Sequence, residues 1–363
     1  MKRILMLTNM YPSPSNPTYG IFVKQTYDWL CADYDVSLVK ITKQKSFMRK
    51  VNAYFLFYVK SIFLGIFKNY DLLYAHFISH AALPVRIIKL FKPKLIVIGN
   101  IHGEDVFFGF KKFSRNRKRS KAFLKVSDYI ISPSDYFKQR LASEYNYPQE
   151  KIILSPSGGV DVSLFKPMEQ EMSKKTLNLD ISKKYIGLAS RLVPGKGCGL
   201  LVEAFSKLND TGYCLVIAGN GSEEENLKKR VCELQISDRV VFMPLLPHEK
   251  LVCFYNSLDI FCFPSESVSE SLGLVGLEAM ACGVLCVVSN NGGIMSYAVD
   301  SRNSLVFEKS NCEDLRLKLQ KAASLDSSKI QSLKSNARNT ALDFASSKVK
   351  NEFLCFFRKV LSL

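Results

Sequence analysis

Two glutamates, Glu270 and Glu278, stand eight residues apart in a stretch rich in serine and glycine. An apolar run that ends at Pro264 is typical of a buried strand, and residues 273–282 have the spacing of a helix that Gly283 closes. Glu270 therefore falls in the loop before this helix, and Glu278 falls inside it.

The start of the predicted helix offers backbone N–H groups to a bound anion. Gly273 and Leu274 lie there, and a helix start after a parallel strand favours a diphosphate. Carboxylates on both sides of that anion would repel it. Glu270 and Glu278 are therefore better suited to accept hydrogen bonds from hydroxyl groups, one on a sugar and one on a ribose. Together these positions predict a nucleotide-sugar site.

A second loop supplies cations for a diphosphate. Arg191 and Lys196 flank a glycine-rich turn before an expected helix at 199–207. An arginine binds a phosphate in bidentate fashion, and a lysine acts as a point charge. An exposed turn with two solvated cations is the plainer interpretation. We prefer the diphosphate site because both loops leave strands of one predicted sheet at the same edge.

Three further positions are candidates for the site. His102 follows an expected strand, where an imidazole can hydrogen-bond a sugar hydroxyl or a phosphate, although a lone histidine is more often structural. Gly20, before a helix, and Gly221, in a strand-to-helix turn, would each let the backbone approach the donor closely. His76 and His80 stand four residues apart, but no third ligand follows, so we expect no metal site.

Composition limits the class of protein. The chain has 363 residues, of which 47% are hydrophobic, so we expect two packed domains. Its ten cysteines are scattered and lie mostly in apolar runs, which indicates reduced, buried thiols rather than a metal site at Cys282 and Cys286. The first apolar run is too short for a signal peptide, and we expect residues 51–67 to be too short and too charged to span a bilayer.

The net charge of +17 is concentrated in the first half of the chain. Residues 1–180 hold 28 Lys and Arg against 14 Asp and Glu, a difference of +14, and the excess gathers at 40–68 and 111–125 among Phe and Tyr. A solvated basic face, an anionic membrane surface and a nucleic acid all fit this pattern. No nucleic-acid recognition motif accompanies it, so we expect no nucleic-acid partner.

Strand-like and helix-like segments alternate along the chain, which is the α/β pattern of parallel sheets with helices on both faces. The alternation breaks at 166–167 and resumes after 184. We therefore expect two Rossmann-like doubly wound domains, residues 1–167 and 168–340, facing each other across a cleft. Residues 341–363 predict an amphipathic helix that packs back across the domain junction. The expected strands are 4–7, 36–39, 72–75, 95–98, 129–131, 152–154, 185–189, 214–218, 240–243, 259–263, 285–289 and 304–307.

These motifs resemble the group 1 glycosyltransferases, also called glycosyltransferase family 4, which are retaining enzymes of the GT-B fold. The resemblance covers most of the chain and is strongest from 190 to 293, where Glu270 and Glu278 form the E-x7-E element. In the first half it rests on Gly20, on 102–105 and on 157–161, a segment close to the family's Asn-Gly-Val-Asp.

The resemblance implies a nucleotide-sugar donor held mainly by the second domain and an acceptor held by the first. Glu270 and His102 would contact the donor sugar, and Glu278 would contact the ribose. Arg191 and Lys196 would bind the diphosphate and stabilise its charge as it leaves, with no metal or other cofactor. We expect a front-face transfer that retains the anomeric configuration, rather than a covalent intermediate on Glu270.

The implied function is a hexosyltransferase that acts on a saccharide or lipid-linked acceptor in cell-surface polysaccharide or lipopolysaccharide synthesis. We expect it in the cytoplasm, peripheral on the inner face of the plasma membrane. A GT-B nucleotide-sugar epimerase would share the cleft, and a non-catalytic basic protein that binds a membrane or nucleic acid is a further alternative. A Rossmann dehydrogenase is disfavoured because no GxGxxG follows the first strand.

Overall fold

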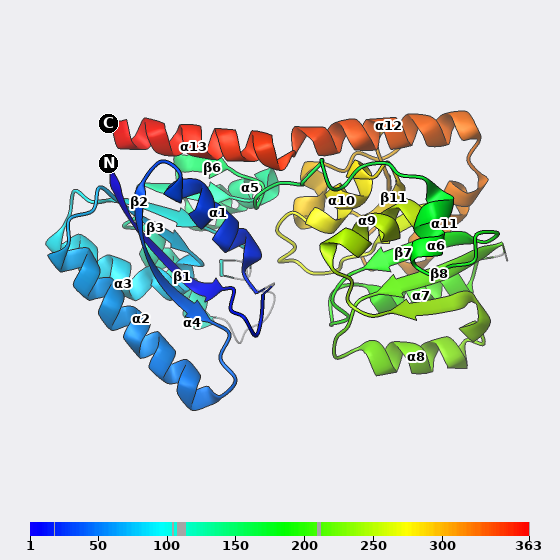
Figure 1. The fold of residues 1–363 in the computed structure, drawn as a ribbon, viewed down its shortest axis with the longest axis horizontal. Coiled ribbons are helices and arrows are strands. Elements are labelled where there is room, and N and C mark those ends of the chain that lie inside the picture. The colour runs from blue at the N-terminus through cyan, green and yellow to red at the C-terminus, as the bar shows by residue number, and fades with distance from the viewer. Residues whose placement is uncertain (18, 104, 107–113, 209–211, 363) are drawn as a thin grey trace. The chain divides into compact units, whose positions relative to one another are not determined.

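The computed structural model describes the chain except for residues 18, 104, 107–113, 209–211 and 363. It divides into two compact units, residues 1–158 with 348–363, and residues 159–347. Each unit contains a six-stranded parallel sheet covered by helices (Figure 1). The two doubly wound sheets predicted from the sequence are therefore confirmed, and all twelve expected strand segments overlap a strand.

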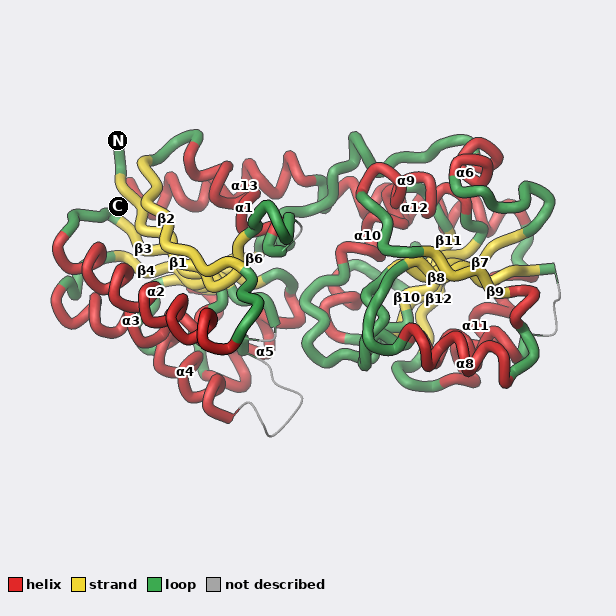
Figure 2. Tube along the Cα trace, turned by 60° about the horizontal axis from the view of Figure 1, so that its bottom comes forward, coloured by secondary structure: helices red, strands yellow, loops and turns green. Residues whose placement is uncertain are grey.

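The sheet of the first unit has the order β2-β1-β3-β4-β5-β6. Alternate side chains of β1 enter two different cores, because successive residues of a strand point to opposite faces. Leu5 and Leu7 pack with α2, α3 and α4, whereas Ile4 and Met6 pack with α1 and α13. Figure 2 shows these two helical layers on either side of the sheet. The elements are β1 (Arg3–Tyr11), α1 (Ile21–Cys31), β2 (Asp35–Thr42), α2 (Phe47–Phe67), β3 (Leu72–His76), α3 (Ile78–Phe91), β4 (Ile96–Asn100), α4 (Ser114–Leu124), β5 (Tyr129–Ser132), α5 (Asp135–Tyr145), β6 (Ile152–Leu154) and most of α13 (Ser346–Ser362).

The sheet of the second unit has the order β12-β11-β10-β7-β8-β9. Strands β7 and β10 are neighbours at its centre, so the loops that follow them leave the same edge of the sheet. The elements are α6 (Gln170–Thr176), β7 (Lys184–Ala189), α7 (Cys198–Ser206), β8 (Tyr213–Ala218), α8 (Glu224–Glu233), β9 (Val240–Met243), α9 (His248–Ser257), β10 (Ile260–Phe263), α10 (Leu274–Ala281), β11 (Leu285–Ser289), β12 (Leu305–Phe307), α11 (Cys312–Ser324) and α12 (Ser327–Asp343).

The end of the chain differs from the single helix expected over 341–363. Two helices, α12 and α13, meet at Phe344 and Ala345. The backbone there pairs with Val160, whose N–H donates to Phe344 O at 2.9 Å and whose carbonyl accepts from Ser346 N at 2.8 Å. These bonds take backbone groups that a continuous helix would use within itself. The expected packing of residues 341–363 across the domain junction stays a prediction.

Helix α2 also differs from expectation. It begins at Phe47 because the Ser46 side chain caps it by accepting from the N–H of Arg49. The helix has 21 residues because it begins four residues before the expected segment 51–67. The expectation that this segment is too short to span a bilayer was therefore wrong. Among the described residues, α2 is the one helix that is long and apolar enough to cross a membrane, judged by length and composition alone.

Candidate active site

The loop between β10 and α10 brings two predicted site residues into contact. The Lys196 ammonium donates to a Glu270 carboxylate oxygen at 2.8 Å, and Ser265 Oγ donates to the same oxygen at 2.8 Å. Their side chains are only 21% and 11% exposed, so this ion pair is largely shielded from solvent. A fixed cation and a fixed carboxylate thus lie side by side at one edge of the sheet.

Glycines allow the β7–α7 loop to reach the β10–α10 loop. The N–H of Glu266 donates to Gly195 O at 2.9 Å. Gly197 has a φ of 72°, and a Cβ on it would lie 1.8 Å from the carbonyl oxygen of Pro264. A side chain here would force the loops apart, and with them Lys196 and Glu270.

Arg191 lies in the same turn as Lys196, directly after β7. Its side chain is exposed, and its carbonyl accepts from Val193 N at 3.0 Å, which closes the turn. Gly221 lies in the adjacent β8–α8 turn, where a Cβ would be 2.1 Å from Leu192 O. Close packing of the two turns therefore explains this glycine, and its direct contact with a donor stays a prediction.

Helix α10 begins at the edge where the ion pair lies. Its N-cap, Gly273, has a φ of 82°, and a Cβ there would be 2.4 Å from the Phe263 ring. Tyr297 fixes this residue by donating from its hydroxyl to Gly273 O at 3.0 Å. Leu274 follows as the first helical residue. The first N–H groups of a helix have no acceptor within it, so this end can receive an anion.

Glu278 lies one turn further along α10 and is held by α9. The Tyr255 hydroxyl donates to a Glu278 carboxylate oxygen at 2.8 Å. Burial raises the pKa of the Glu278 carboxyl, while the bond from Tyr255 and the nearby His248 act in the opposite direction. The carboxylate is thereby oriented while its second oxygen is left to accept from a ligand.

The sequence did not indicate the residues that brace the β10–α10 loop. Ser289 Oγ donates to Ser265 O at 2.7 Å, and the Asn291 amide donates to Ser265 O and Ser267 O at 3.0 and 2.9 Å. Gly293 N donates to the carbonyl oxygen of Glu270 at 3.1 Å. Asn291 and Gly293 follow β11. Their place after a strand of the same sheet is the one signal in the sequence that could have indicated them.

In the first unit, His102 lies at the end of a hydrogen-bonded chain. His102 Nε2 is 2.9 Å from His76 Nδ1, and His76 Nε2 is 3.1 Å from Thr26 Oγ1. The Thr26 hydroxyl has one hydrogen, and it donates this hydrogen in a hydrogen bond to Val23 O at 2.9 Å. His76 therefore donates a hydrogen bond from Nε2 to Thr26. At Nδ1 it accepts a hydrogen bond from the Nε2–H of His102.

Within the part of the chain that the structure describes, the same bonds leave His102 Nδ1 as an acceptor without a partner, on a neutral ring. Burial lowers the pKa of His102 to about 3 and that of His76 well below its usual value. The ring lies against Phe22 and Phe77, with ring centroids 4.9 and 4.4 Å away. The backbone N–H of His102 donates to the Asp105 carboxylate at 2.9 Å. The expected role towards a sugar stays a prediction.

Gly20 caps α1 in the first unit with a φ of 77°, and a Cβ there would lie 2.9 Å from Met10 O. His76 and His80 do not form a pair, because His76 is engaged with His102, and His80 Nδ1 lies 3.1 Å from Ser79 Oγ. Within the described ranges no group of three or more His, Cys, Asp or Glu is arranged to hold a metal ion.

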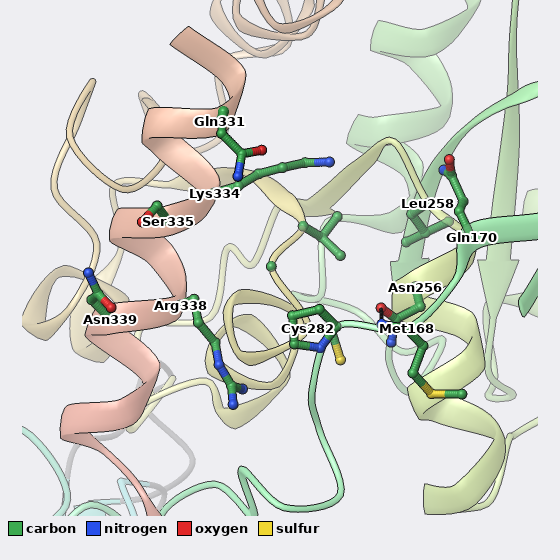
Figure 3. A pocket seen from close by; sticks show the side chains of 13 residues that line it. Met168, Gln170, Asn256, Leu258, Cys282, Gln331, Lys334, Ser335, Arg338 and Asn339 are labelled. Carbon is green, nitrogen blue, oxygen red and sulfur yellow. Dashed lines mark hydrogen bonds between the residues drawn. The ribbon is translucent and has the colours of Figure 1, made fainter. Parts of the chain in front are cut away.

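A pocket in the second unit lies apart from these residues (Figure 3). Met168 and Gln170 line one side, and Lys334 and Arg338 of α12 line the other. The Arg338 guanidinium is used within the protein, because it donates to the backbone carbonyl of Phe165 at 2.8 Å and to that of Ala281. None of the nine predicted site residues lines this pocket, so we do not assign the donor to it.

Comparison with known proteins agrees with the fold and the motifs. A model of the group 1 glycosyl transferases matches residues 169–340, and a model of glycosyltransferase family 4 matches residues 26–163. The D-inositol 3-phosphate glycosyltransferase of Mycolicibacterium smegmatis is 33% identical over 174 residues, which are 46% of this chain and 39% of that protein. The match thus spans about two fifths of that relative's length.

Two solved structures share the whole fold. Sucrose-phosphate synthase from Thermosynechococcus elongatus has a TM-score of 0.78 at 19% identity, covering 100% of both chains. Anabaena HepE in complex with UDP-glucose has a TM-score of 0.77 at 18% identity, covering 99% of this chain and 100% of that one. The fold is GT-B, with two Rossmann-like domains. Because the two family models together account for most of both halves, the chain belongs to the group 1, or family 4, glycosyltransferases.

Proposed function

We propose that the protein is a retaining hexosyltransferase. It moves a hexose from a nucleoside diphosphate sugar to a saccharide or lipid-linked acceptor in cell-surface polysaccharide or lipopolysaccharide synthesis, on the cytoplasmic side of the membrane. The observation that carries this proposal is the shielded contact between Lys196 and Glu270 beside the start of α10. A cation suited to a phosphate thus lies next to a carboxylate suited to sugar hydroxyls, which supports a site for the junction between a diphosphate and its sugar.

The donor would bind along the edge formed by the β7 and β10 loops. Its diphosphate would accept hydrogen bonds from the first backbone N–H groups of α10 and from the side chains of Lys196 and Arg191. Glu270 would accept from sugar hydroxyls, and Glu278, which Tyr255 orients, would accept from the ribose. These interactions need neither a metal nor another cofactor.

The transfer step would rely on fixed charges. As the bond to the sugar breaks, negative charge grows on the leaving diphosphate, and Lys196 and Arg191 stabilise it without reorganising. The leaving phosphate would take the proton of the acceptor hydroxyl, which attacks from the same face, so the anomeric configuration is retained. Neutral His102 would accept a hydrogen bond from a donor-sugar hydroxyl at Nδ1.

Thermal-shift measurements with UDP-, GDP- and ADP-sugars test donor binding. A ligand at 100 times its Kd stabilises the folded protein by about 2.7 kcal/mol, so one donor class should raise the melting temperature. Lys196→Ala and Arg191→Ala should abolish that rise, whereas Lys229→Ala, which removes an exposed cation from α8, should keep it. If no sugar nucleotide stabilises the protein and all variants behave alike, the transferase proposal fails.

Transfer itself is tested with the donor found in this way. Removal of one hydrogen-bonding group that stabilises the developing charge lowers kcat by a factor of roughly 10²–10³, so Lys196→Ala should lower the kcat of transfer by that factor. Proton NMR of the glycosylated product should show the anomeric configuration of the donor. Conversion of the donor to its epimer without any acceptor would instead identify an epimerase.

A further inference from the structure

Helix α2 turns a row of large apolar side chains away from the protein. Val51, Phe55, Val59, Phe63 and Phe67 recur every four residues, so each lies beside the next in a row that winds gradually around the exposed side of the helix, and each is between 49% and 70% exposed. Phe47 and Met48 extend this face at the first turn, at 78% and 74% exposed. An exposed apolar surface of this length on one helix marks a binding surface.

The opposite face of α2 is committed to the first unit. Phe57 and Ser61 are buried, and Gly65 packs so tightly on α3 that a Cβ would lie 2.4 Å from the Ile88 side chain. Figure 2 shows α2 beside α3 on one face of the sheet. A helix that packs on protein along one side cannot be surrounded by lipid, so α2 is suited to lie flat on a bilayer rather than to cross it.

The charges along α2 are all of one sign. Residues 36–70 contain seven Lys and Arg and no Asp or Glu. Exposed cations lie at the start of the helix, in its middle and at its end, namely Lys45, Arg49, Lys50, Lys60 and Lys68. Cations that accompany an apolar face match anionic headgroups above an acyl layer. A second copy of this face would bring like charges together, which disfavours self-association.

We propose that α2 docks the protein on an anionic lipid bilayer, with its exposed apolar row inserted at the boundary between headgroups and acyl chains and its cations against lipid phosphates. The partner is the lipid surface itself. This proposal goes beyond sugar transfer and does not depend on it, because it uses none of the donor-site residues.

Co-sedimentation with vesicles tests the docking. The full chain should pellet with vesicles of equimolar phosphatidylcholine and phosphatidylglycerol, and at least about tenfold less with phosphatidylcholine alone. Phe55→Ser with Phe63→Ser should weaken binding to the anionic vesicles by about tenfold or more. The matched control, Leu317→Ser with Leu342→Ser, removes two exposed apolar side chains from the second unit and should bind like the wild type.

The orientation of α2 is tested with tryptophan at Met48, Phe55 or Phe63, three exposed positions on the same side of the helix, each introduced singly. The one native tryptophan, Trp29, is 8% exposed and gives a constant background. Lipids brominated near the headgroup should quench all three positions equally if the helix lies flat. A spanning helix would place Phe55→Trp at the bilayer centre, where only bromines deep in the acyl chains quench it, and that result overturns the flat orientation.

Other outcomes of these measurements also overturn the proposal. These are no sedimentation of the wild type with either vesicle, equal sedimentation of the Phe55 and Phe63 double variant, or a dimer in solution that this variant disrupts. Donor-induced thermal stabilisation, measured on the same preparations without vesicles, reports the second unit separately. A docking failure with intact donor binding, or the reverse, therefore tells the two proposals apart.

Discussion

The chain of His102, His76 and Thr26 fixes a protonation state that the sequence could not reveal. A histidine after a strand predicted a hydrogen-bonding group, but not which nitrogen would face a ligand. Because Thr26 is a donor to Val23, the tautomers of both rings follow from the hydrogen-bond directions. His102 is therefore suited to accept a hydrogen bond at Nδ1 and is poorly suited to act as a cation.

This tautomer leads to a spectroscopic prediction. In ¹⁵N-edited long-range spectra at pH 7, His102 should carry its hydrogen on Nε2 and show a bare Nδ1. His76→Phe removes the acceptor of that hydrogen, so both tautomers of His102 should then appear. A wild-type spectrum with Nδ1 protonated would contradict the assignment. His80→Phe, at a histidine that does not contact His102, is the control.

The buried histidines also predict how stability depends on pH. Burial lowers the pKa of His102 to about 3 and that of His80 to about 4, below their unfolded value of about 6.5. Between pH 6.5 and 4 the unfolded chain binds these protons and the folded chain does not. Stability should therefore fall with decreasing pH, by on the order of 1 kcal/mol per unit for each such histidine.

Urea unfolding at pH 7 and pH 5 measures this dependence. His102→Asn should lose part of the pH-linked change in the free energy of unfolding, because the variant has one proton fewer to bind in the unfolded state. His80→Asn should likewise lose its own part of that change, because burial lowers the pKa of His80 too. Equal slopes in His102→Asn and the wild type would mean that His102 titrates normally in the folded protein.

At the scale of elements, buried apolar runs made the strands predictable. Each strand of a doubly wound sheet is covered on both faces, so its sequence is almost continuously apolar, as in β11, where all five residues are buried. Helix α4 carries Arg and Lys at five of its eleven positions and lacks a helical apolar stripe, so its bounds were not predicted. The bounds of helix α9, which supplies Tyr255 to Glu278, were not predicted either.

The candidate site was predictable only in part, for a related reason. Residue types and their place after strands indicated Lys196, Glu270 and Glu278. The sequence did not indicate how the loops interlock, because this depends on backbone contacts such as that of Gly197 with Pro264. Bracing by Asn291 comes from a loop that follows another strand, and no local pattern marks it.

Two glycines at the start of α7, Gly197 and Gly199, test this interlocking of the loops. Gly197→Ala should destabilise the protein by about 1–3 kcal/mol, because φ is 72° and the Cβ would meet Pro264 O, and it should weaken donor binding by separating Lys196 from Glu270. Gly199→Ala, two residues on, meets nothing within 4 Å and should be neutral or stabilising by up to about 1 kcal/mol. Urea unfolding and donor thermal shifts compare the two. Equal effects would contradict the interlocked arrangement.

At the scale of the whole molecule, the first unit is built from both ends of the chain. Helix α13 covers one face of its sheet with Val349, Phe353 and Phe357, and Phe353 lies edge-on to Trp29 with 5.8 Å between ring centroids. The chain therefore leaves the first unit after residue 158, forms the second, and returns at residue 348.

Removal of residues 346–363 should expose that face. Trp29, the one tryptophan of the chain, would lose the Phe353 ring, so its fluorescence should shift to longer wavelength and become accessible to iodide. A truncation variant that retains the wild-type emission would contradict the packing. Phe356→Ala removes a half-buried ring of α13 that does not contact Trp29, and it should leave the emission in place.

The return of α13 sets an order of events during synthesis. Residues 159–347 have all left the ribosome before the last segment of the first unit emerges, so the second unit can complete its core while β1 to β6 still lack one covering layer. The half of the protein that is made first is thus the half that is finished last. A premature stop codon at residue 346 would remove α13 and leave an apolar sheet face open, and so a target for chaperones or proteases.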